Sequence, residues 1–263
     1  MAPASDLATA AGVTLPDGAA TLELVGGYLQ TAMGRAELSR LRFHRDRAEL
    51  EHLHRRCAQA QVWLGRGGFG FGGLQDPSDL LDRARLAGAV LDAPELLQIA
   101  SFLEAIAGLA AALLGQEREL WPELAALAAG IPEVRELLQA LRRALLPTGE
   151  VNDDASPELG RLRRRRTSQR QAIEAALAEQ MRRLSGEGVL QDELVTLRNE
   201  RFVLPVRAEQ RRRAAGVVHG ASSSGQTLFV EPLETVELNN ENIRLRDMEH
   251  AEVLRILAAL TAK

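Results

Sequence analysis

Cysteine, lysine and aromatic residues are scarce in this 263-residue chain, and each scarcity excludes a class of structure or site. Cys57 is the only cysteine, so neither an intrachain disulfide framework nor a cysteine-based zinc site can form, and a reducing cytoplasm fits. Lys263 is the only lysine, so a Walker A loop, which needs Gly-Lys-Ser/Thr, cannot be completed in this chain. Aromatic residues make up 3%, which favours aliphatic helix packing over a β-sandwich.

Long uncharged apolar runs are also missing. The N-terminal stretch MAPASDLATAAGVTLPDG has neither a basic start nor a sustained apolar segment. No run elsewhere reaches the roughly 18 uncharged apolar residues of a membrane span. We therefore expect a cytoplasmic protein with no export signal and no membrane partner.

Positive charge is concentrated in one segment, although the whole chain has a net charge of -4. Residues 161–213 carry 14 arginines and 7 acidic residues, a local charge of +7. The rest of the chain sums to -11, because 18 basic and 29 acidic residues remain. A field confined to one stretch indicates contact with a polyanion such as nucleic acid, although an arginine-rich helix is often only a solvated face.

Residues 1–150 show leucine and valine at helical spacing and predict a helical core. We expect interruptions near Met33 and Gly34 and at the glycine-rich GRGGFGFGG, residues 65–73. That glycine-rich stretch follows no strand and precedes no lysine or serine, so we interpret it as a connector and not as a phosphate loop.

Two aspartates in this block are followed closely by proline, as at helix starts. Asp76 with Pro77, and Asp92 with Pro94, are typical of an N-cap followed by a first-turn proline. Pro147 and Gly149 stop the last helix of the block. The segments predicted as helices are 77–90, 94–115, 121–129 and 132–145.

The spacing within residues 151–190 predicts one long helix, from Ser156 to about Leu184. Ser156 is the expected N-cap and Pro157 the first-turn residue, and Gly186 and Gly188 end the helix. The middle of this helix, RRRRTSQRQ, is polar on all sides, which is typical of a helix that projects into solvent or needs a partner. We interpret it as an arm.

Residues 191–232 change to short β-type runs and predict a small antiparallel sheet. Pro205 cannot donate to a ladder, so its strand is expected at an edge or to bend there. Residues 233–263 return to helical spacing with no stop signal before Lys263, from which we expect the natural protein to continue. The expected strand segments are 194–197, 201–206, 216–218 and 227–230.

The stretch GVVHGASSSGQTLFVE, residues 216–231, is most simply a hairpin with a hydrogen-bonding tip. A serine hydrolase would need Gly-x-Ser-x-Gly on a strand-to-helix turn, and this stretch lacks the final glycine and the helix. His219 beside the serines is more often a hairpin hydrogen-bonding group than a base. His52 and His54 point to different faces of a helix, so we expect no metal site there, and we find no catalytic or cofactor site.

Four blocks carry a resemblance to a known family: NDDASPELGRLR, RNERFVLPVRAEQR, GVVHGASSSGQTLFVEP and VELNN. In this order and spacing they resemble the bacterial MutS paralogues, the recombination-suppressing branch of the MutS family. They span about residues 151–245. In the clamp block this family commonly has lysines and an aspartate where Arg207 and Gly220 stand here, and arginine keeps the positive charge.

The resemblance implies a mainly α fold with a small antiparallel β clamp: a helical core at 1–150, an outgoing lever at 151–190, the clamp at 191–232 and a returning lever at 233–263. It also implies an ATPase domain that binds ATP and Mg beyond this chain, followed by an Smr endonuclease domain, in a homodimer that encloses nucleic acid. Phe229-Val230-Glu231 echoes the mismatch-reading Phe-x-Glu of other MutS proteins, but it ends a clamp strand here, so we discount it.

From the basic segment and the resemblance together, we expect a clamp that grips branched or structured DNA by its phosphates. Structured RNA of collided ribosomes is a competing polyanion, and a dimerisation or protein-docking module is the alternative of another class. For the arm, a solvated face paired with glutamates remains open. The residues expected to contact phosphate are Arg207, Arg211, Arg212, Arg213, Ser222, Ser223, Ser224, Arg161, Arg163, Arg164, Arg165 and Arg166.

Overall fold

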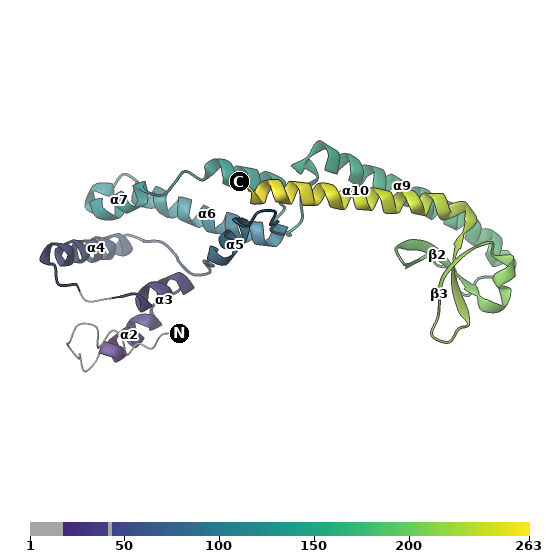
Figure 1. The fold of residues 1–263 in the computed structure, drawn as a ribbon, viewed down its shortest axis with the longest axis horizontal. Helices are drawn as coiled ribbons and strands as arrows, with labels where there is room; N and C mark the ends of the chain where they lie inside the picture. Colours follow the sequence, from purple (N-terminus) through teal and green to yellow (C-terminus); the bar gives the residue numbers. More distant parts are fainter. Residues whose placement is uncertain (1–17, 42–43) are drawn as a thin grey trace. The chain divides into compact units, whose positions relative to one another are not determined.

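The computed structural model describes residues 18–41 and 44–263, and the predicted absence of an N-terminal targeting segment falls on residues outside these ranges. The chain divides into two compact units. Unit 1 comprises residues 1–150 and 258–263, and unit 2 comprises residues 151–257. Helices and a small four-stranded sheet make up the fold, which confirms the predicted mainly α class with a small antiparallel sheet (Figure 1).

Unit 1 is built from helices, as its leucine spacing predicts. Thr31 caps α3 by accepting a hydrogen bond from the Gly34 backbone N–H. The break expected near Met33 and Gly34 is present but lies slightly earlier, at residues 28–31 between α2 and α3, because Thr31 already starts α3. The elements are α2 (Gly18–Gly27), α3 (Ala32–Ser39), α4 (Arg47–Gly65), α5 (Ser78–Ala84), α6 (Ala93–Leu113), η1 (Arg118–Leu120), α7 (Pro122–Ala129) and α8 (Arg135–Ala144).

The two predicted aspartate–proline helix starts behave differently. Asp92 caps α6 in a complete capping box, in which the Asp92 and Glu95 side chains accept from each other's backbone N–H. Asp76 instead accepts from both the backbone N–H and the hydroxyl of Ser78, so Pro77 takes the N-cap position. Helix α5 is also shorter than the predicted 77–90.

The described core of unit 1 joins α4, α6 and α7 around two tryptophans. Trp63 and Trp121 are 8% and 3% exposed, and the Trp121 indole N–H donates to the Leu113 carbonyl at 2.9 Å. Phe69 and Phe71 of the glycine-rich stretch pack against this cluster, so the stretch is a connector that also closes the core. Among the described helices, α6 is long and apolar enough to cross a membrane, by length and composition only. It carries two glutamates and packs against α7 and α8.

Unit 2 contains two long antiparallel helices, α9 (Pro157–Gly186) and most of α10 (Val236–Thr261), with a sheet at one end of the pair (Figure 1). Ser156 caps α9 by accepting from the Leu159 N–H, and Gly188 adopts a φ of 67° just beyond the helix end, as predicted. Short turns η2 (Asp153–Ala155) and η4 (Leu233–Thr235) precede the two helices.

The sheet has the strand order β1-β2-β4-β3, with every pairing antiparallel. The predicted hairpin of residues 216–231 is confirmed as β3 and β4. A short 3-10 turn, η3, connects β2 to β3. The elements are β1 (Thr196–Arg198), β2 (Arg201–Arg207), η3 (Ala208–Arg213), β3 (Gly216–Ala221) and β4 (Thr227–Pro232).

Strand β2 changes its partner halfway along. Its pairing with β1 ends at Val203, and its pairing with β4 begins at Leu204. Pro205 lies in the second half, where its outer side faces Gln191, whose backbone N–H donates to the Pro205 carbonyl at 2.9 Å. Although the strand order puts β2 inside the sheet, the half of β2 that holds Pro205 pairs with a strand, β4, on one side only. This fits proline, which has no backbone N–H to donate to a second strand.

One face of the sheet packs on α9. The buried residues of this cluster alternate along the strands, and Leu204, Val206 and Val230 are at most 1% exposed. They pack with Ile173 and Leu177 of α9, both fully buried. The position of the sheet at the end of the helix pair therefore rests on an aliphatic core.

Candidate nucleic-acid interface

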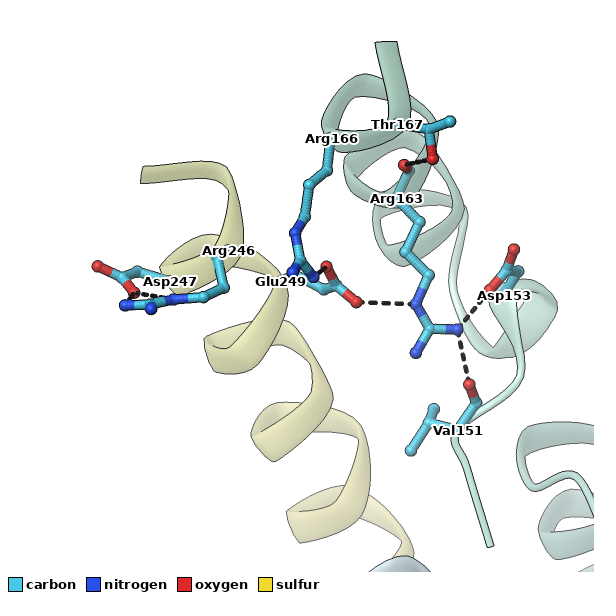
Figure 2. A network of polar contacts seen from close by, with 8 residues as sticks. All are labelled: Val151, Asp153, Arg163, Arg166, Thr167, Arg246, Asp247 and Glu249. Carbon is cyan, nitrogen blue, oxygen red and sulfur yellow. Dashed lines mark hydrogen bonds and ion pairs between the residues drawn. The ribbon is translucent and has the colours of Figure 1, made fainter. Parts of the chain in front are cut away.

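Two arginines of the α9 arm, Arg163 and Arg166, point towards α10 and bind Glu249 (Figure 2). Arg163 Nε lies 3.0 Å from Glu249 Oε1, and Arg166 lies 2.7 Å from Glu249 Oε2. Arg163 also donates to the Val151 carbonyl and to Asp153. Arg163 thus joins α9, α10 and the segment before η2 within unit 2.

Burial and charge act in opposite directions on the pKa of these groups. Burial raises the pKa of Glu249, but hydrogen bonds from Arg166 and Arg163 outweigh it, so this pKa lies below its usual value. Burial lowers the pKa of Arg163, but its hydrogen bonds to Asp153 and Glu249 outweigh it and raise this pKa. Glu249 and Arg163 therefore both stay charged near neutral pH.

The other arm arginines are more exposed. Arg161 pairs with Glu158 within α9, and its side chain is 66% exposed. Arg165 pairs with Glu241 of α10 at 3.0 Å and is 60% exposed. Arg164 makes no ion pair or side-chain hydrogen bond within residues 18–41 and 44–263. Most of the arm charge is therefore matched by carboxylates, as the alternative of a solvated, paired face expects.

The arginines next to the sheet divide into two kinds. Arg211 donates to the backbone carbonyls of Ala214 and Gly216, at 2.7 and 2.6 Å, and so holds the chain between η3 and β3. Arg207 donates to the Leu190 carbonyl at 3.2 Å. Arg212 and Arg213 are exposed and have no partner in the described part of the chain, so their guanidinium groups remain available to a ligand.

The three serines form the tip of the β3–β4 hairpin. Ser222 is used by the turn itself, because its hydroxyl accepts from the Thr227 N–H at 3.1 Å and its carbonyl accepts from Gly225. Ser223 and Ser224 are exposed. Arg207 pairs with Thr227 in the sheet, so Arg207 and the hairpin tip occupy the same end of the sheet.

His219 belongs to a buried polar network, which explains this residue without catalysis. It lies at a β-bulge in β3, and its Nε2 is 2.7 Å from Oε2 of Glu231. Glu231 is 1% exposed, and its other oxygen accepts from Arg201 at 2.7 Å and from Asn239 at 2.8 Å. A buried carboxylate is costly unless it is paired, and here three donors satisfy it.

The same network fastens the β1–β2 hairpin to α10. Asn239 is fully buried and bonds both the N–H and the carbonyl of Phe202, while Asn240 accepts from Arg201. In the turn of this hairpin, Asn199 donates to the His219 carbonyl. Residue patterns alone did not identify this network, although its members lie in the blocks RNERF, VVHG, FVEP and LNN.

The chain is similar in sequence to a group of known proteins. No protein-family model matches the chain. The chain is 42% identical over 176 residues to a protein of Pelotomaculum thermopropionicum named Endonuclease MutS2, covering 66% of this chain and 22% of that protein. It is 39% identical over 223 residues to the Thermomicrobium roseum protein of the same name, covering 83% of this chain and 28% of that protein.

A third relative, also named Endonuclease MutS2, comes from Clostridioides difficile. It is 32% identical over 244 residues, which cover 92% of this chain and 31% of the relative. The chain belongs to the MutS2 family. It spans about a fifth to a third of the length of these MutS2 relatives, so the activity of a whole MutS2 protein cannot be assigned to it directly.

Proposed function

We propose that this chain is the core, lever and clamp part of a MutS2-type protein, and that its clamp contacts the phosphates of branched or structured DNA. In this proposal residues 1–150 are the core, 151–190 and 233–263 are the two levers, and 191–232 are the clamp. The parent protein would be a homodimeric ATPase, with ATP and Mg bound outside this chain and an Smr endonuclease domain, and it would suppress recombination in the cytoplasm.

Arg212 and Arg213 carry this proposal. Both are exposed, adjacent in sequence and without a carboxylate partner among the described residues. A guanidinium fits a phosphate oxygen pair and stays charged at all relevant pH values. Contacts of this kind position a protein on nucleic acid without reading sequence, as expected for a protein that recognises DNA shape.

The hairpin tip and Arg207 offer further donors, at the end of the sheet away from Gly216, where the chain that follows Arg213 enters β3. Ser223 and Ser224 can donate hydroxyl hydrogen bonds to phosphate oxygens, and Arg207 lies at the same end of the sheet. Arg211 contributes differently, because its bonds to backbone carbonyls hold η3 in place. The arm arginines contribute charge to the surroundings, since most of them are paired.

Two alternatives have support. Structured RNA, including ribosomal RNA, presents the same phosphates and would use the same arginines. A dimerisation or protein-docking role is favoured by exposed apolar side chains on α10, since Met248 and Leu254 are 48% and 43% exposed.

The test is a salt-dependent binding measurement on the full chain with four-way junction, duplex and single-stranded DNA and ribosomal RNA. We expect Arg212→Ala/Arg213→Ala to weaken binding of the preferred polyanion. The slope of log affinity against log salt should fall by about 1.8, because two phosphate contacts release about 0.9 counterions each. The probe that binds most tightly distinguishes DNA from RNA.

A matched control removes the same charge elsewhere. Arg40→Ala/Arg47→Ala changes two exposed unit 1 arginines, which are 72% and 92% exposed, and should leave the slope unchanged. If both double variants lowered the affinity and the salt slope equally, the loss would reflect the net charge of the protein and not a contact made by the clamp. Unchanged affinity and slope in Arg212→Ala/Arg213→Ala would remove the clamp assignment, and light scattering would then test the dimerisation alternative.

A further inference from the structure

The stripe of buried apolar side chains along α9 is interrupted in the middle of the helix by arginines. Leu159 and Leu162 are buried at one end of the stripe, and Ile173 and Leu177 are buried at the other. None of the residues of α9 between Leu162 and Ile173 is fully buried. At three- and four-residue spacing, the stripe continues through Arg163, Arg166 and Arg170.

This interruption leaves a groove of about 690 Å³ within unit 2. One wall is α9 and the other is α10, which contributes Ile243 and Arg246. Leu197 and Phe202 of the β1–β2 hairpin line the end nearer the sheet. The groove is large enough for a small ligand, and it combines apolar surface with cationic groups.

Stability does not account for the charged lining. A half-buried ion pair between helices is often no more stable than well-packed apolar side chains of the same volume, because both charges lose water. The lining includes four guanidinium groups and three carboxylates, which leaves an excess of positive charge. These groups are Arg163, Arg166, Arg170 and Arg246, with Asp153, Glu200 and Glu249.

Several guanidinium donors in the groove remain available. Arg166 uses NH1 for Glu249 and is 42% exposed. Arg170 uses Nε for Glu174, and its NH1 and NH2 groups make no hydrogen bond in the described part of the chain. Each guanidinium carries five N–H donors, so both arginines can bind an anion without losing their present partners.

The Arg170 guanidinium lies over the aromatic ring of Phe202. The Arg170 guanidinium carbon is 5.7 Å from the centre of this ring. Asn239 of α10 fixes the backbone N–H and carbonyl of Phe202, so the ring is presented on a rigid strand. A planar apolar surface next to guanidinium donors suits a ligand with a flat ring at one end and a phosphate at the other.

We propose that this groove binds one nucleotide, with the phosphate held by Arg166 and Arg170 and the base lying against Phe202, Leu197 and Ile243. The nucleotide is either free or part of a single strand, since both present the same phosphate and base. The site is separate from Arg212 and Arg213, so this proposal does not depend on the clamp proposal.

The test measures binding of four probes to the full chain by calorimetry: AMP, adenosine, inorganic phosphate and a short single-stranded oligoadenylate. We expect AMP to bind more tightly than adenosine or phosphate alone. Tighter binding of the oligonucleotide would identify a nucleotide within a strand, and equal binding would identify a free nucleotide. The absence of saturable binding of AMP and of the oligonucleotide would overturn the proposal.

Variants then locate the site. Arg166→Leu/Arg170→Leu restores the apolar stripe, so the protein should stay folded while AMP affinity falls at least tenfold. Glu249→Gln frees Arg163 and Arg166 from a competing carboxylate and should raise the affinity severalfold. Arg40→Ala/Arg47→Ala, which changes two exposed arginines of unit 1, should bind AMP as the unchanged protein does. Unchanged AMP binding by Arg166→Leu/Arg170→Leu would refute the assignment.

Discussion

Removal of the Glu231 carboxylate is the most informative single change in unit 2. Glu231→Ala removes the only carboxylate partner, among the described residues, of the Arg201 guanidinium, which is 21% exposed and keeps Asn240 as an acceptor. It also removes one of the two acceptors of the fully buried Asn239 amide. Loss of one partner of a buried ion pair costs about 3–5 kcal/mol, mainly because the other charge stays buried. Glu231→Gln keeps the side-chain volume but loses the charge, and should cost about 1.5–3 kcal/mol.

The assay is native-state hydrogen exchange of the full chain, followed in peptides from residues 196–232. One factor of ten in exchange corresponds to about 1.4 kcal/mol, so Glu231→Ala should exchange on the order of 10²–10³-fold faster in this segment. Trp63 and Trp121, the two tryptophans of the chain, both lie in unit 1. Urea unfolding followed by tryptophan fluorescence is therefore an internal control, and its midpoint should not move.

The reasoning fails if Glu231→Gln changes the exchange of the sheet by less than about twofold, or about 0.4 kcal/mol. A double-mutant cycle with His219→Ala adds a second check. Two residues that share a hydrogen-bond network should show a coupling energy of about 0.5–3 kcal/mol. Additive effects of the two substitutions would show that His219 is not part of the network in solution.

Four further predictions concern individual residues in unit 2. Gly216→Ala should sharply destabilise the β3–β4 hairpin, because an added Cβ would clash with the Glu231 carbonyl oxygen of β4. Hydrogen exchange of residues 216–232 should therefore become faster, and an exchange rate equal to that of the unchanged protein would contradict this close packing. Glu200→Gly should leave the free energy of unfolding nearly unchanged, as measured by urea unfolding followed by circular dichroism. Glycine adopts the positive φ of 65° at this position without strain, which offsets the loss of the exposed ion pair with Arg246. A decrease in the free energy of unfolding of more than about 2 kcal/mol would contradict this reasoning. Ser156→Ala removes both a helix cap and a hydrogen bond to Glu252, and should cost about 1–2 kcal/mol in the same assay. Hydrogen bonds from Arg255 and from Ser156 lower the pKa of Glu252 from 4.5 to about 2. The contribution of Glu252 to the stability of the fold should therefore be complete above pH 4.5 and be lost as the pH falls towards 2. A thermal unfolding midpoint that does not change over this pH range would contradict the contact.

Local features of the sequence predicted the helices and the hairpin well, because their causes are local. Ser156 and Gly188 mark the two ends of α9 through capping and a positive φ, and both are visible as residue types. The β3–β4 hairpin follows from two alternating apolar runs around a serine and glycine turn. The break predicted near Met33 lies a few residues earlier, because the N-cap residue that starts α3 is Thr31.

The site required contacts between distant residues, which a single sequence does not reveal. Arg163 and Glu249 are 86 residues apart, so the pattern RRRR gave no sign that one member is paired and another free. Arg211, Arg212 and Arg213 look equivalent in sequence, yet only Arg211 is consumed by backbone carbonyls. The phosphate contacts themselves remain predictions for the binding experiment.

The outer strand β3 also bears on how this protein behaves at high concentration. Exposed backbone carbonyls at a sheet edge invite strands from other molecules and so promote aggregation. Here the Gly216 carbonyl is occupied by Arg211 and the His219 carbonyl by Asn199, and the bulge at His219 interrupts the regular spacing of the edge. The side chains of Arg211 and Asn199 thus hinder the addition of a strand from another molecule to β3. Removing both side chains should make the protein prone to precipitate while it is still folded.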